Sequence, residues 1–471
     1  MNLINPSIFK TYDVRGIYPE PFNEEAAEAI GWAIVEYFRS PRSIVVGRDM
    51  RASSEPLFEA LAKGITSAGS DVIDIGVVTN PALSQTVSMD NYPVGVMISA
   101  SHNPPEYNGF KIVGKKGVQL SADTGLAEIA EIAMSHPERS EGSHVAERDP
   151  STIGRDDTRV IEGKIIKKDI TKQYYDFVLN LAKDIKPGLK VVIDAGNGMG
   201  GEFNKPVFDK LPVKYFPLYF KPDGKFPNHL ANPAEPENLR DIIAAVKKRK
   251  ADLGIAFDGD ADRAFFVDDE GQVVNPGYCL LLLAQCALSM SHDKRIYYDM
   301  RFPRIVPGQL KKMGAKPMKT RAGNPFYKQK LINGGGAMAA EVSGHIFFAD
   351  GNGLDDALIA SVKMLEFLSH QKKPISVLVD RFAKSSCYSG EINLPVKNSG
   401  KVIVELEKRY RRQGKITKLD GLTVESDDWW FNIRASNTEL LMRLTMETKP
   451  DVKYMQQKKK EILSAIKRID A

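Results

Sequence analysis

The chain has 471 residues and the composition of a globular protein, with 42% hydrophobic, 27% charged and 8% aromatic residues. This length exceeds what one ordinary core can organise and predicts two to four domains. The formal net charge is only +5 and the basic residues are spread along the chain, which argues against a nucleic acid partner and favours an anionic small substrate.

Strand-like apolar runs alternate with helical patterns over most of the sequence. The strand-like "SIVVGRDMR" (43–51) precedes the helical "SEPLFEALAKGITSAG" (54–69), and "DVIDIGVV" (71–78) follows. The same rhythm returns at "PVGVMISASHNP", "LKVVIDAGNGMGG", "ADLGIAFDGDADR", "KRIYYDM" and "GAMAAEVSGHIFF". This alternation predicts doubly wound α/β domains with functional groups at the carboxyl ends of the strands.

Two segments depart from this rhythm. Residues 134–160 are charged, Ser-rich and nearly free of large apolar groups, which predicts an exposed insertion or a disordered loop. Its His136 and His144 fit solvated loop residues better than metal ligands. From about residue 385 the chain becomes strand-rich between helical Lys/Glu patterns, and a smaller α+β domain is expected there.

The longest apolar run, "YCLLLLAQCAL" (278–288), is too short to cross a bilayer and predicts a core helix. The start of the chain lacks the charged-then-apolar pattern of a secretory signal. The three cysteines are widely spaced and suggest neither a disulfide framework nor a metal cage. These features favour a cytoplasmic protein with no membrane partner.

The first candidate site is "SASHNPP" (99–105), which follows the apolar run "VGVMI". Ser101 lacks the Gly-x-Ser-x-Gly setting of hydrolases, and Ser and His adjacent in sequence rarely face one another as nucleophile and base. A serine that carries phosphate, with His102 and loop amides around it, fits the pattern better. Taken alone, the motif would favour a helix cap.

The second candidate is "DGDADR", where Asp258, Asp260 and Asp262 follow the apolar "LGIAF". This spacing can bring three carboxylates around one hard cation. An EF-hand is excluded because its sixth position is Arg263 instead of Gly. A phosphatase-type Asp nucleophile and a solvated acidic turn remain alternatives, with metal binding favoured.

Two further loops carry recognition chemistry. In "EVSGH", Glu341 and Ser343 could accept and donate hydrogen bonds to the hydroxyls of a polyol such as a sugar, although a lone His345 beside a strand is usually structural. In "IRASNTELLMR", guanidiniums, hydroxyls and loop amides could cradle a phosphate. The alternative there is an ordinary helix N-cap, which could itself bind an anion. The residues of this loop are Arg434, Ser436, Asn437, Thr438 and Arg443.

Together these loops resemble the α-D-phosphohexomutase family, most closely its phosphomannomutase/phosphoglucomutase branch. The resemblance extends over nearly all of the chain except 134–160, and the full set of motifs in this order is very specific. The motifs are "FKTYDVRG", "SASHNPPEYNGFK", "VVIDAGNGMGG", "FPNHLANPAEPENL", "DGDADR", "TRAGN", "EVSGH" and "RASNTE".

The resemblance implies a four-domain, heart-shaped α/β enzyme with a central active-site cleft. Three related α/β domains with mixed sheets would be followed by an α+β domain. They would carry the phosphoserine, metal, sugar and phosphate loops in turn. The expected boundaries are 1–165, 166–269, 270–382 and 383–471.

The resemblance also implies residue roles. Ser101 would be the phosphoserine, and its phosphate would join Asp258, Asp260 and Asp262 in holding Mg²⁺. Arg15 and Lys111 stand at the family's proton-handling positions, and His102 and His345 complete the expected catalytic set. The expected substrate-binding residues are Tyr12, Arg263, Arg301, Gly323, Asn324, Glu341, Ser343, His345, Arg434, Ser436, Asn437, Thr438 and Arg443.

The activity implied by the resemblance is interconversion of hexose 1-phosphate and hexose 6-phosphate, with mannose, glucose or both as the sugar. A hexose 1,6-bisphosphate would serve as intermediate and activator, and the enzyme would be a monomer or weak homodimer. A phosphoglucosamine mutase is the nearest alternative, although Val342 stands where that branch typically has Gln. A non-catalytic sugar-phosphate-binding protein and a HAD-like phosphatase are alternatives from other classes.

The chain departs from the family pattern at four positions. Asn324 stands where many relatives have His, and it can neither transfer protons nor carry charge. Arg301 replaces a common Lys but keeps a cation. Ala340 replaces a usual Gly, and Leu440 replaces a frequent Pro.

Overall fold

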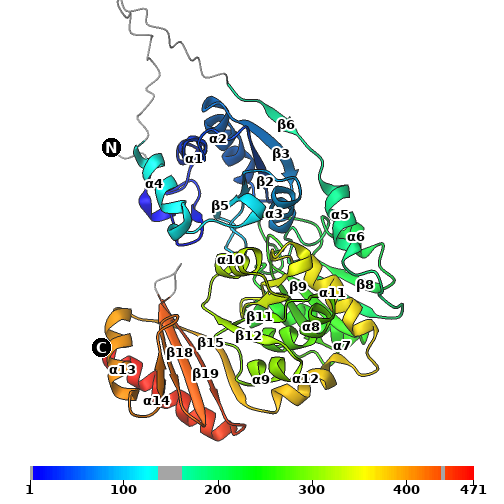
Figure 1. Cartoon of the computed structure of the whole chain (residues 1–471), viewed down its shortest axis with the longest axis vertical. Coiled ribbons are helices and arrows are strands. Elements are labelled where there is room, and N and C mark those ends of the chain that lie inside the picture. Colours follow the sequence, from blue (N-terminus) through cyan, green and yellow to red (C-terminus); the bar gives the residue numbers. More distant parts are fainter. Residues whose placement is uncertain (1–3, 136–161, 436–440, 471) are drawn as a thin grey trace, which may run out of the picture. The chain divides into compact units, whose positions relative to one another are not determined.

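The computed structural model describes residues 4–135, 162–435 and 441–470. The chain divides into two compact units, Met1–Lys172 and Gln173–Ala471. Four sheets follow one another along the sequence, one in the first unit and three in the second (Figure 1). In the part of the chain that is described, no helix has both the length and the hydropathy that crossing a membrane requires.

The sheet of the first unit has six strands in the order β1-β5-β4-β2-β3-β6. Strands β4, β2, β3 and β6 run parallel, whereas β5 pairs antiparallel with both β4 and β1. The strands are β1 (Val14–Ile17), β2 (Ser43–Arg48), β3 (Asp71–Val77), β4 (Val94–Ile98), β5 (Tyr107–Gly114) and β6 (Ile165–Lys167). The helices are α1 (Glu24–Tyr37), α2 (Ser54–Ser67), α3 (Asn80–Met89) and α4 (Leu126–Ser135).

Side chains of β2 and β4 alternate between two helical layers. Val46 and Val96 belong to the core that the strands share with α1, α2 and α4. Gly47 faces the other way, where an added Cβ would meet Val78 at 2.8 Å and Leu83 of α3 at 3.2 Å. The glycine therefore allows α3 to pack closely on the second face of the sheet.

The second unit begins with two further mixed sheets, in the orders β10-β9-β7-β8 and β12-β11-β13-β14. The strands are β7 (Lys190–Asp194), β8 (Lys214–Leu218), β9 (Leu253–Phe257), β10 (Ala264–Asp268), β11 (Arg295–Asp299), β12 (Lys316–Thr320), β13 (Met338–Ala340) and β14 (Ile346–Phe348). The helices are α5 (Thr171–Asn180), α6 (Lys205–Phe208), α7 (Arg240–Arg249), α8 (Pro276–Met290), α9 (Ile305–Lys312), α10 (Asn324–Gly334), α11 (Ala357–Ser369) and α12 (Ile375–Ala383).

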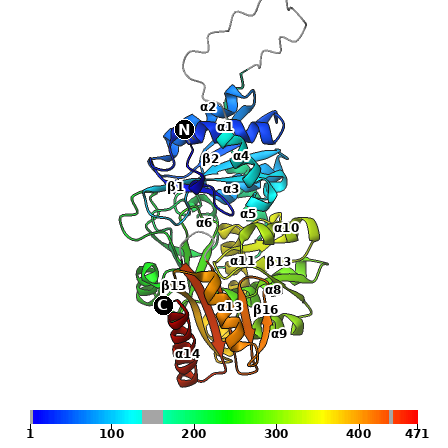
Figure 2. The same ribbon diagram turned by 90° about the vertical axis from the view of Figure 1, so that its left-hand side faces the viewer.

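The fourth sheet is antiparallel, in the order β15-β19-β18-β17-β16. Helices α13 and α14 pack against each other and bury a shared core against this sheet (Figure 2). This confirms the α+β arrangement expected after residue 385. The elements are β15 (Cys387–Pro395), α13 (Ser399–Tyr410), β16 (Lys415–Thr417), β17 (Leu422–Glu425), β18 (Trp429–Ala435), β19 (Leu441–Thr448) and α14 (Val452–Asp470).

The first three sheets share one feature that positions the candidate site. In each, the last parallel strand turns back into an antiparallel partner, as β4–β5, β9–β10 and β13–β14. The turns of these hairpins contain Ser101, the Asp258–Asp262 loop and the Glu341–His345 loop in that order. Three sequence motifs thus occupy one topological position in three related α/β folds.

Three expectations need correction. The insertion was expected to start at Met134, but Met134 and Ser135 still belong to helix α4, and Met134 packs against the core of the first unit. Residues 136–160 lie outside the described residues. The alternative of a helix after Arg434 is wrong, because Leu441 begins strand β19, which pairs with β18. The helix cap considered for Ser101 is also wrong, since its turn joins two strands.

Candidate active site

Ser101 lies in the turn between β4 and β5, is buried, and has the left-handed backbone angle φ 51°. A non-glycine residue adopts this conformation only where its surroundings enforce it, and such positions cluster at functional sites. The Ser101 N–H donates to the hydroxyl of Ser99 at 2.9 Å, and Nδ1 of His102 lies 3.3 Å from Ser101 Oγ. The turn therefore fixes a serine hydroxyl beside an imidazole.

Arg51 holds this turn in place. Its guanidinium is buried and donates to the carbonyl oxygens of Ser101 at 3.0 Å and Asn103 at 2.6 Å. It also donates to the carbonyls of Pro104 at 2.6 Å and Tyr107 at 3.1 Å, while Asp49 accepts from its Nε at 3.2 Å. One guanidinium thus supports four backbone acceptors on the loop that contains the serine.

The expected proton-handling residues lie on the strands next to this turn. Arg15 on β1 donates from Nη1 to Asn103 Oδ1 at 2.7 Å and forms an ion pair with Asp13. Lys111 is buried on β5. The carbonyl oxygen of Tyr12 accepts a hydrogen bond from Gln119 Nε2. Arg15 therefore contacts the serine turn through Asn103.

Asp258, Asp260 and Asp262 are all buried, and one carboxylate oxygen of each lies within 4.8 Å of the others. Asp258 accepts from Arg263 Nε at 2.7 Å and from the N–H groups of Asp262 and Arg263, both at 3.1 Å. Three buried carboxylates so close together repel one another unless a cation offsets their charge. This all-oxygen donor set fits a hard divalent cation such as Mg²⁺.

His345 ends the third hairpin turn and is held by carboxylates. Its Nδ1 lies 2.9 Å from Asp355 and 3.7 Å from Asp262, and these carboxylates raise the pKa of His345 although burial opposes this. Asp355 also pairs with the buried Lys328 at 2.7 Å and accepts from Asn324. Asn324 therefore helps to orient the Asp355–His345 pair, a role that needs no proton transfer.

Glu341 and Ser343 lie in the same turn, where Gly344 has φ +95° and an added Cβ would meet the Phe265 ring at 2.5 Å. Glu341 accepts from the Gly323 N–H at 2.9 Å and lies 3.3 Å from Arg301 Nη2. The hydroxyl of Ser343 is buried and has no hydrogen-bond partner among the described residues. An unsatisfied buried hydroxyl beside a carboxylate suits a ligand that carries hydroxyl groups.

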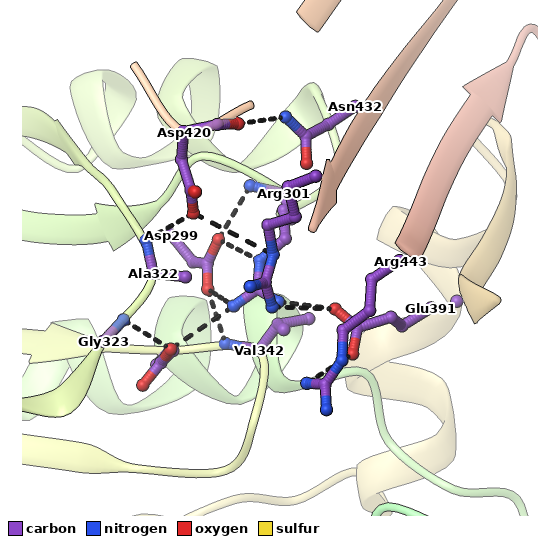
Figure 3. A network of polar contacts seen from close by, with 12 residues as sticks. Asp299, Arg301, Ala322, Gly323, Val342, Glu391, Asp420, Asn432 and Arg443 are labelled. Atoms are coloured by element: carbon purple, nitrogen blue, oxygen red, sulfur yellow. Dashed lines mark hydrogen bonds and ion pairs between the residues drawn. The ribbon is translucent and has the colours of Figure 1, made fainter. Parts of the chain in front are cut away.

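Arg301 is 2% exposed and is surrounded by three carboxylates (Figure 3). Asp299 accepts from its Nε at 2.9 Å and its Nη2 at 2.5 Å, and Glu391 accepts from its Nη1 at 2.6 Å. These anions keep the pKa of Arg301 well above its usual value despite burial. The cation expected at this position is present, and it links the third sheet to β15.

The two arginines of the predicted phosphate loop lie on neighbouring strands, Arg434 on β18 opposite Arg443 on β19. Glu391 accepts a hydrogen bond from Arg434 at 3.4 Å and forms an ion pair with Arg443 at 3.2 Å. These guanidiniums and that of Arg301 lower the pKa of Glu391 although burial would raise it. Ser436, Asn437 and Thr438 lie outside the described residues.

Several residues of these networks were not predicted from the sequence, among them Arg51, Asp299, Lys328, Asp355 and Glu391. Asp299 could have been predicted, because it is the last residue of strand β11 and lies two residues before Arg301. The other functional turns also begin at or just after the end of a strand. The other four of these five residues reach their partners from distant parts of the sequence and have no motif of their own.

Comparisons with known proteins agree with this geometry. Three family models match the chain, each described as phosphoglucomutase/phosphomannomutase, alpha/beta/alpha domain: domain I over residues 6–140, domain II over 172–271 and domain III over 275–385.

Similar proteins match over almost their entire length. A phosphoglucomutase of Neisseria gonorrhoeae is 34% identical over 99% of this chain and 98% of its own. A phosphomannomutase of Escherichia coli is 33% identical over 98% and 99%. The crystal structure of a phosphoglucomutase/phosphomannomutase family protein of Burkholderia thailandensis superposes with a TM-score of 0.84, at 31% identity and 98% coverage of both chains.

Proposed function

The chain belongs to the α-D-phosphohexomutase family that includes phosphoglucomutases and phosphomannomutases, and we propose that it interconverts hexose 1-phosphates and hexose 6-phosphates. The observation that carries this proposal is the repeated hairpin turn. Three related folds present, at one topological position, a strained serine, a carboxylate triplet and a hydroxyl-binding loop. Phosphoryl transfer to and from a sugar requires these three chemistries.

Ser101 is the proposed carrier of the phosphoryl group. Phosphoserine would lose its phosphoryl group to the free hydroxyl of a hexose 1-phosphate, so that a P–O bond to the sugar forms as the bond to Ser101 Oγ breaks. The product is a hexose 1,6-bisphosphate. After it reorients, Ser101 Oγ accepts the phosphoryl group from position 1, and hexose 6-phosphate leaves.

The side chains around each reacting group take supporting roles in this proposal. Arg15, Lys111 and His102 would manage charge and protons at the serine, and Arg51 fixes the backbone of its turn. His345, held by Asp355, would exchange a proton with the sugar hydroxyl. An imidazole that is hydrogen-bonded to a carboxylate is held in one ring orientation, which suits proton exchange.

The proposed cofactor is Mg²⁺, held by Asp258, Asp260 and Asp262 and by the phosphate on Ser101. The ion would neutralise charge on the transferring phosphoryl oxygens. Support comes from the three buried carboxylates, whose oxygens lie within 4.8 Å of one another. Arg263 pairs with Asp258 and limits the excess negative charge of the loop.

Substrate recognition would be divided between two loops. Glu341 and Ser343, with the backbone of Gly323, would bind sugar hydroxyls, and Arg434 and Arg443 would bind the phosphate that is not reacting. The proposed binding set also includes Tyr12, Asn324, Arg301, Ser436, Asn437 and Thr438. Mannose and glucose remain the candidate sugars, and the proposed partner is the phosphosugar alone, bound by a monomer or weak homodimer.

The test is a coupled assay of the purified protein with the 1-phosphates of glucose, mannose and glucosamine, together with its intact mass. Turnover of glucose or mannose 1-phosphate, a ~80 Da adduct on Ser101 and loss of both in Ser101→Ala are expected. Conversion of glucosamine 1-phosphate alone would favour the phosphoglucosamine mutase. Free phosphate without an isomerised sugar would favour a phosphatase, and binding without turnover a non-catalytic protein.

A further inference from the structure

Two arginines of the fourth sheet face each other directly. Arg434 and Arg443 occupy opposite positions in the β18–β19 pair, and Arg434 is buried. Like charges opposite one another destabilise an antiparallel pair. Burial and the nearby guanidinium of Arg301 lower the pKa of Arg434, and Arg443 adds a smaller repulsion in the same direction. The two side chains therefore need an anion between them.

Glu391 supplies this anion (Figure 3). One of its carboxylate oxygens lies 3.2 Å from Arg443, and the other lies 3.4 Å from Arg434 and 2.6 Å from Arg301. The pairing of β15 with β19 shifts register between Tyr388 and Glu391, and Glu391 is the first residue to pair regularly after this shift. A single carboxylate thus contacts three guanidiniums, as a phosphate would.

Glu391 differs from the other carboxylates of this network in how it is anchored. Asp299 accepts from the N–H groups of Arg301 and Val342, Glu341 accepts from Gly323, and Asp420 accepts from Ala322. Every partner that Glu391 has among the described residues is a guanidinium. Its side chain is also 25% exposed, whereas that of Asp299 is fully buried. Glu391 is therefore the carboxylate that can turn away into solvent without breaking a backbone contact.

The charges of the network favour such a movement. Three guanidiniums (Arg301, Arg434 and Arg443) contact four carboxylates (Asp299, Glu341, Glu391 and Asp420). A phosphate dianion added to this set would meet an excess of negative charge and would compete with Glu391 for Arg434 and Arg443. If one carboxylate moves away, guanidinium donors become available to the phosphate, and the repulsion between the phosphate and the carboxylates also falls.

We propose that Glu391 is a positioning residue that holds the place of phosphate in the substrate-free enzyme and is displaced when the substrate phosphate binds. The proposal rests on the proposed function in one respect, since it takes Arg434 and Arg443 as the phosphate-binding arginines. The carboxylate keeps the opposed guanidiniums together and also competes for them. Because of this competition, only a fraction of the molecules has the arginines free for phosphate. The apparent Kd for phosphate is the intrinsic Kd divided by that fraction.

The test measures binding and needs no turnover. Inorganic phosphate and glucose 6-phosphate are titrated calorimetrically into full-length Ser101→Ala protein, alone and with Glu391→Gln, Glu391→Ala or Glu405→Gln added. Gln keeps the shape of Glu391 and removes its charge. Glu405 lies on α13, 42% exposed and paired with Lys408, so its variant makes the same change of net charge outside the network. Circular dichroism checks that each variant is folded.

Glu391→Gln should tighten both Kd values about three- to tenfold, and Glu405→Gln should leave them unchanged. With Ser101 restored, Glu391→Gln should lower KM for glucose 1-phosphate without raising kcat. A role as a permanent support would instead weaken binding, so an unchanged or larger Kd in folded Glu391→Gln overturns the proposal. If no variant turns over any hexose phosphate, the proposed function fails, but the inorganic phosphate titration still decides the role of Glu391.

Discussion

The guanidinium of Arg51 and the carbonyl oxygen of Ser101 are joined by a hydrogen bond of 3.0 Å, which ties the segment after β2 to the turn after β4. Because the same guanidinium supports three further carbonyls, lysine cannot replace it: one ammonium cannot reach four acceptors. Arg51→Lys should lower kcat by about 10- to 100-fold through misplacement of the serine. A coupled mutase assay measures this effect.

Arg48→Lys is the matched control for that variant. Arg48 also forms a partly buried ion pair, with Asp74 at 2.7 Å, and it donates to Glu55, which lies outside the serine turn. It should lower Tm and leave kcat close to wild type. Equal losses of kcat in the two variants would mean that Arg51 acts only through general stability.

Metal binding should be visible as stability. Asp258, Asp260 and Asp262 repel one another when no cation is bound, so Mg²⁺ should raise Tm by mass action and a chelator should lower it. Asp260→Asn removes one negative charge and should raise Tm in chelator while abolishing the response to Mg²⁺. The measurement is a thermal melt with and without the ion.

Glu270→Gln is the control, since Glu270 lies exposed after the same hairpin. It should keep the full Mg²⁺ response. A Mg²⁺ response that survives in Asp260→Asn would place the ion elsewhere.

Glu341 should determine which sugar is preferred, whereas Arg434 should bind the phosphate of either sugar. Glu341 contacts Gly323 and Arg301 and is part of the proposed hydroxyl-binding turn, so Glu341→Gln should change the glucose-to-mannose ratio of kcat/KM. Arg434→Ala should weaken both sugars alike, by about 2–4 kcal/mol for a buried charge-assisted contact. Steady-state kinetics on both 1-phosphates decides between them. The reverse pattern would show that the two loops have been assigned the wrong way round.

Asp356 should make stability depend on pH. Burial raises its pKa to about 7, although it accepts from the N–H groups of Leu358 and Ile359 and from the Tyr174 hydroxyl. The folded protein therefore keeps a proton that the unfolded chain loses near pH 4, and stability falls as the pH rises from 4 to 7. Asp356→Asn should remove this loss and raise Tm at pH 8 by about 2–6 °C, with little gain at pH 4.

The pH series needs a carboxylate control. Asp380→Asn changes a half-exposed carboxylate that pairs with Lys384, and its Tm should differ little from wild type at either pH. A gain for Asp356→Asn that is the same at pH 4 and pH 8 would exclude titration of Asp356 as its cause.

The sequence was informative where function and local structure coincide. Asp258, Asp260 and Asp262 follow an apolar run directly, and Gly344 bends the turn that holds Glu341, so both loops were predicted between the right elements. The apolar "LLMRL" (440–444) after Arg434 is compatible with a helix or a strand. The segment from Leu441 forms a strand because it pairs with β18.

The supporting residues could not be predicted in the same way. Arg51 reaches a turn 50 residues away, and Glu391 reaches Arg301 from 90 residues away. Such contacts depend on tertiary pairing, which a local pattern does not encode. Lys328 and Asp355 meet for the same reason, one from a helix and the other from a loop.

The hairpin that surrounds each functional turn also sets the order in which the turns can form during synthesis. Strands β4 and β5, β9 and β10, and β13 and β14 are neighbours in sequence, so closing each turn costs little chain entropy and takes microseconds. Translation adds residues far more slowly. The serine turn can therefore close before the carboxylate loop has been translated, and that loop before the sugar-binding turn, so the enzyme acquires its chemistry one hairpin at a time.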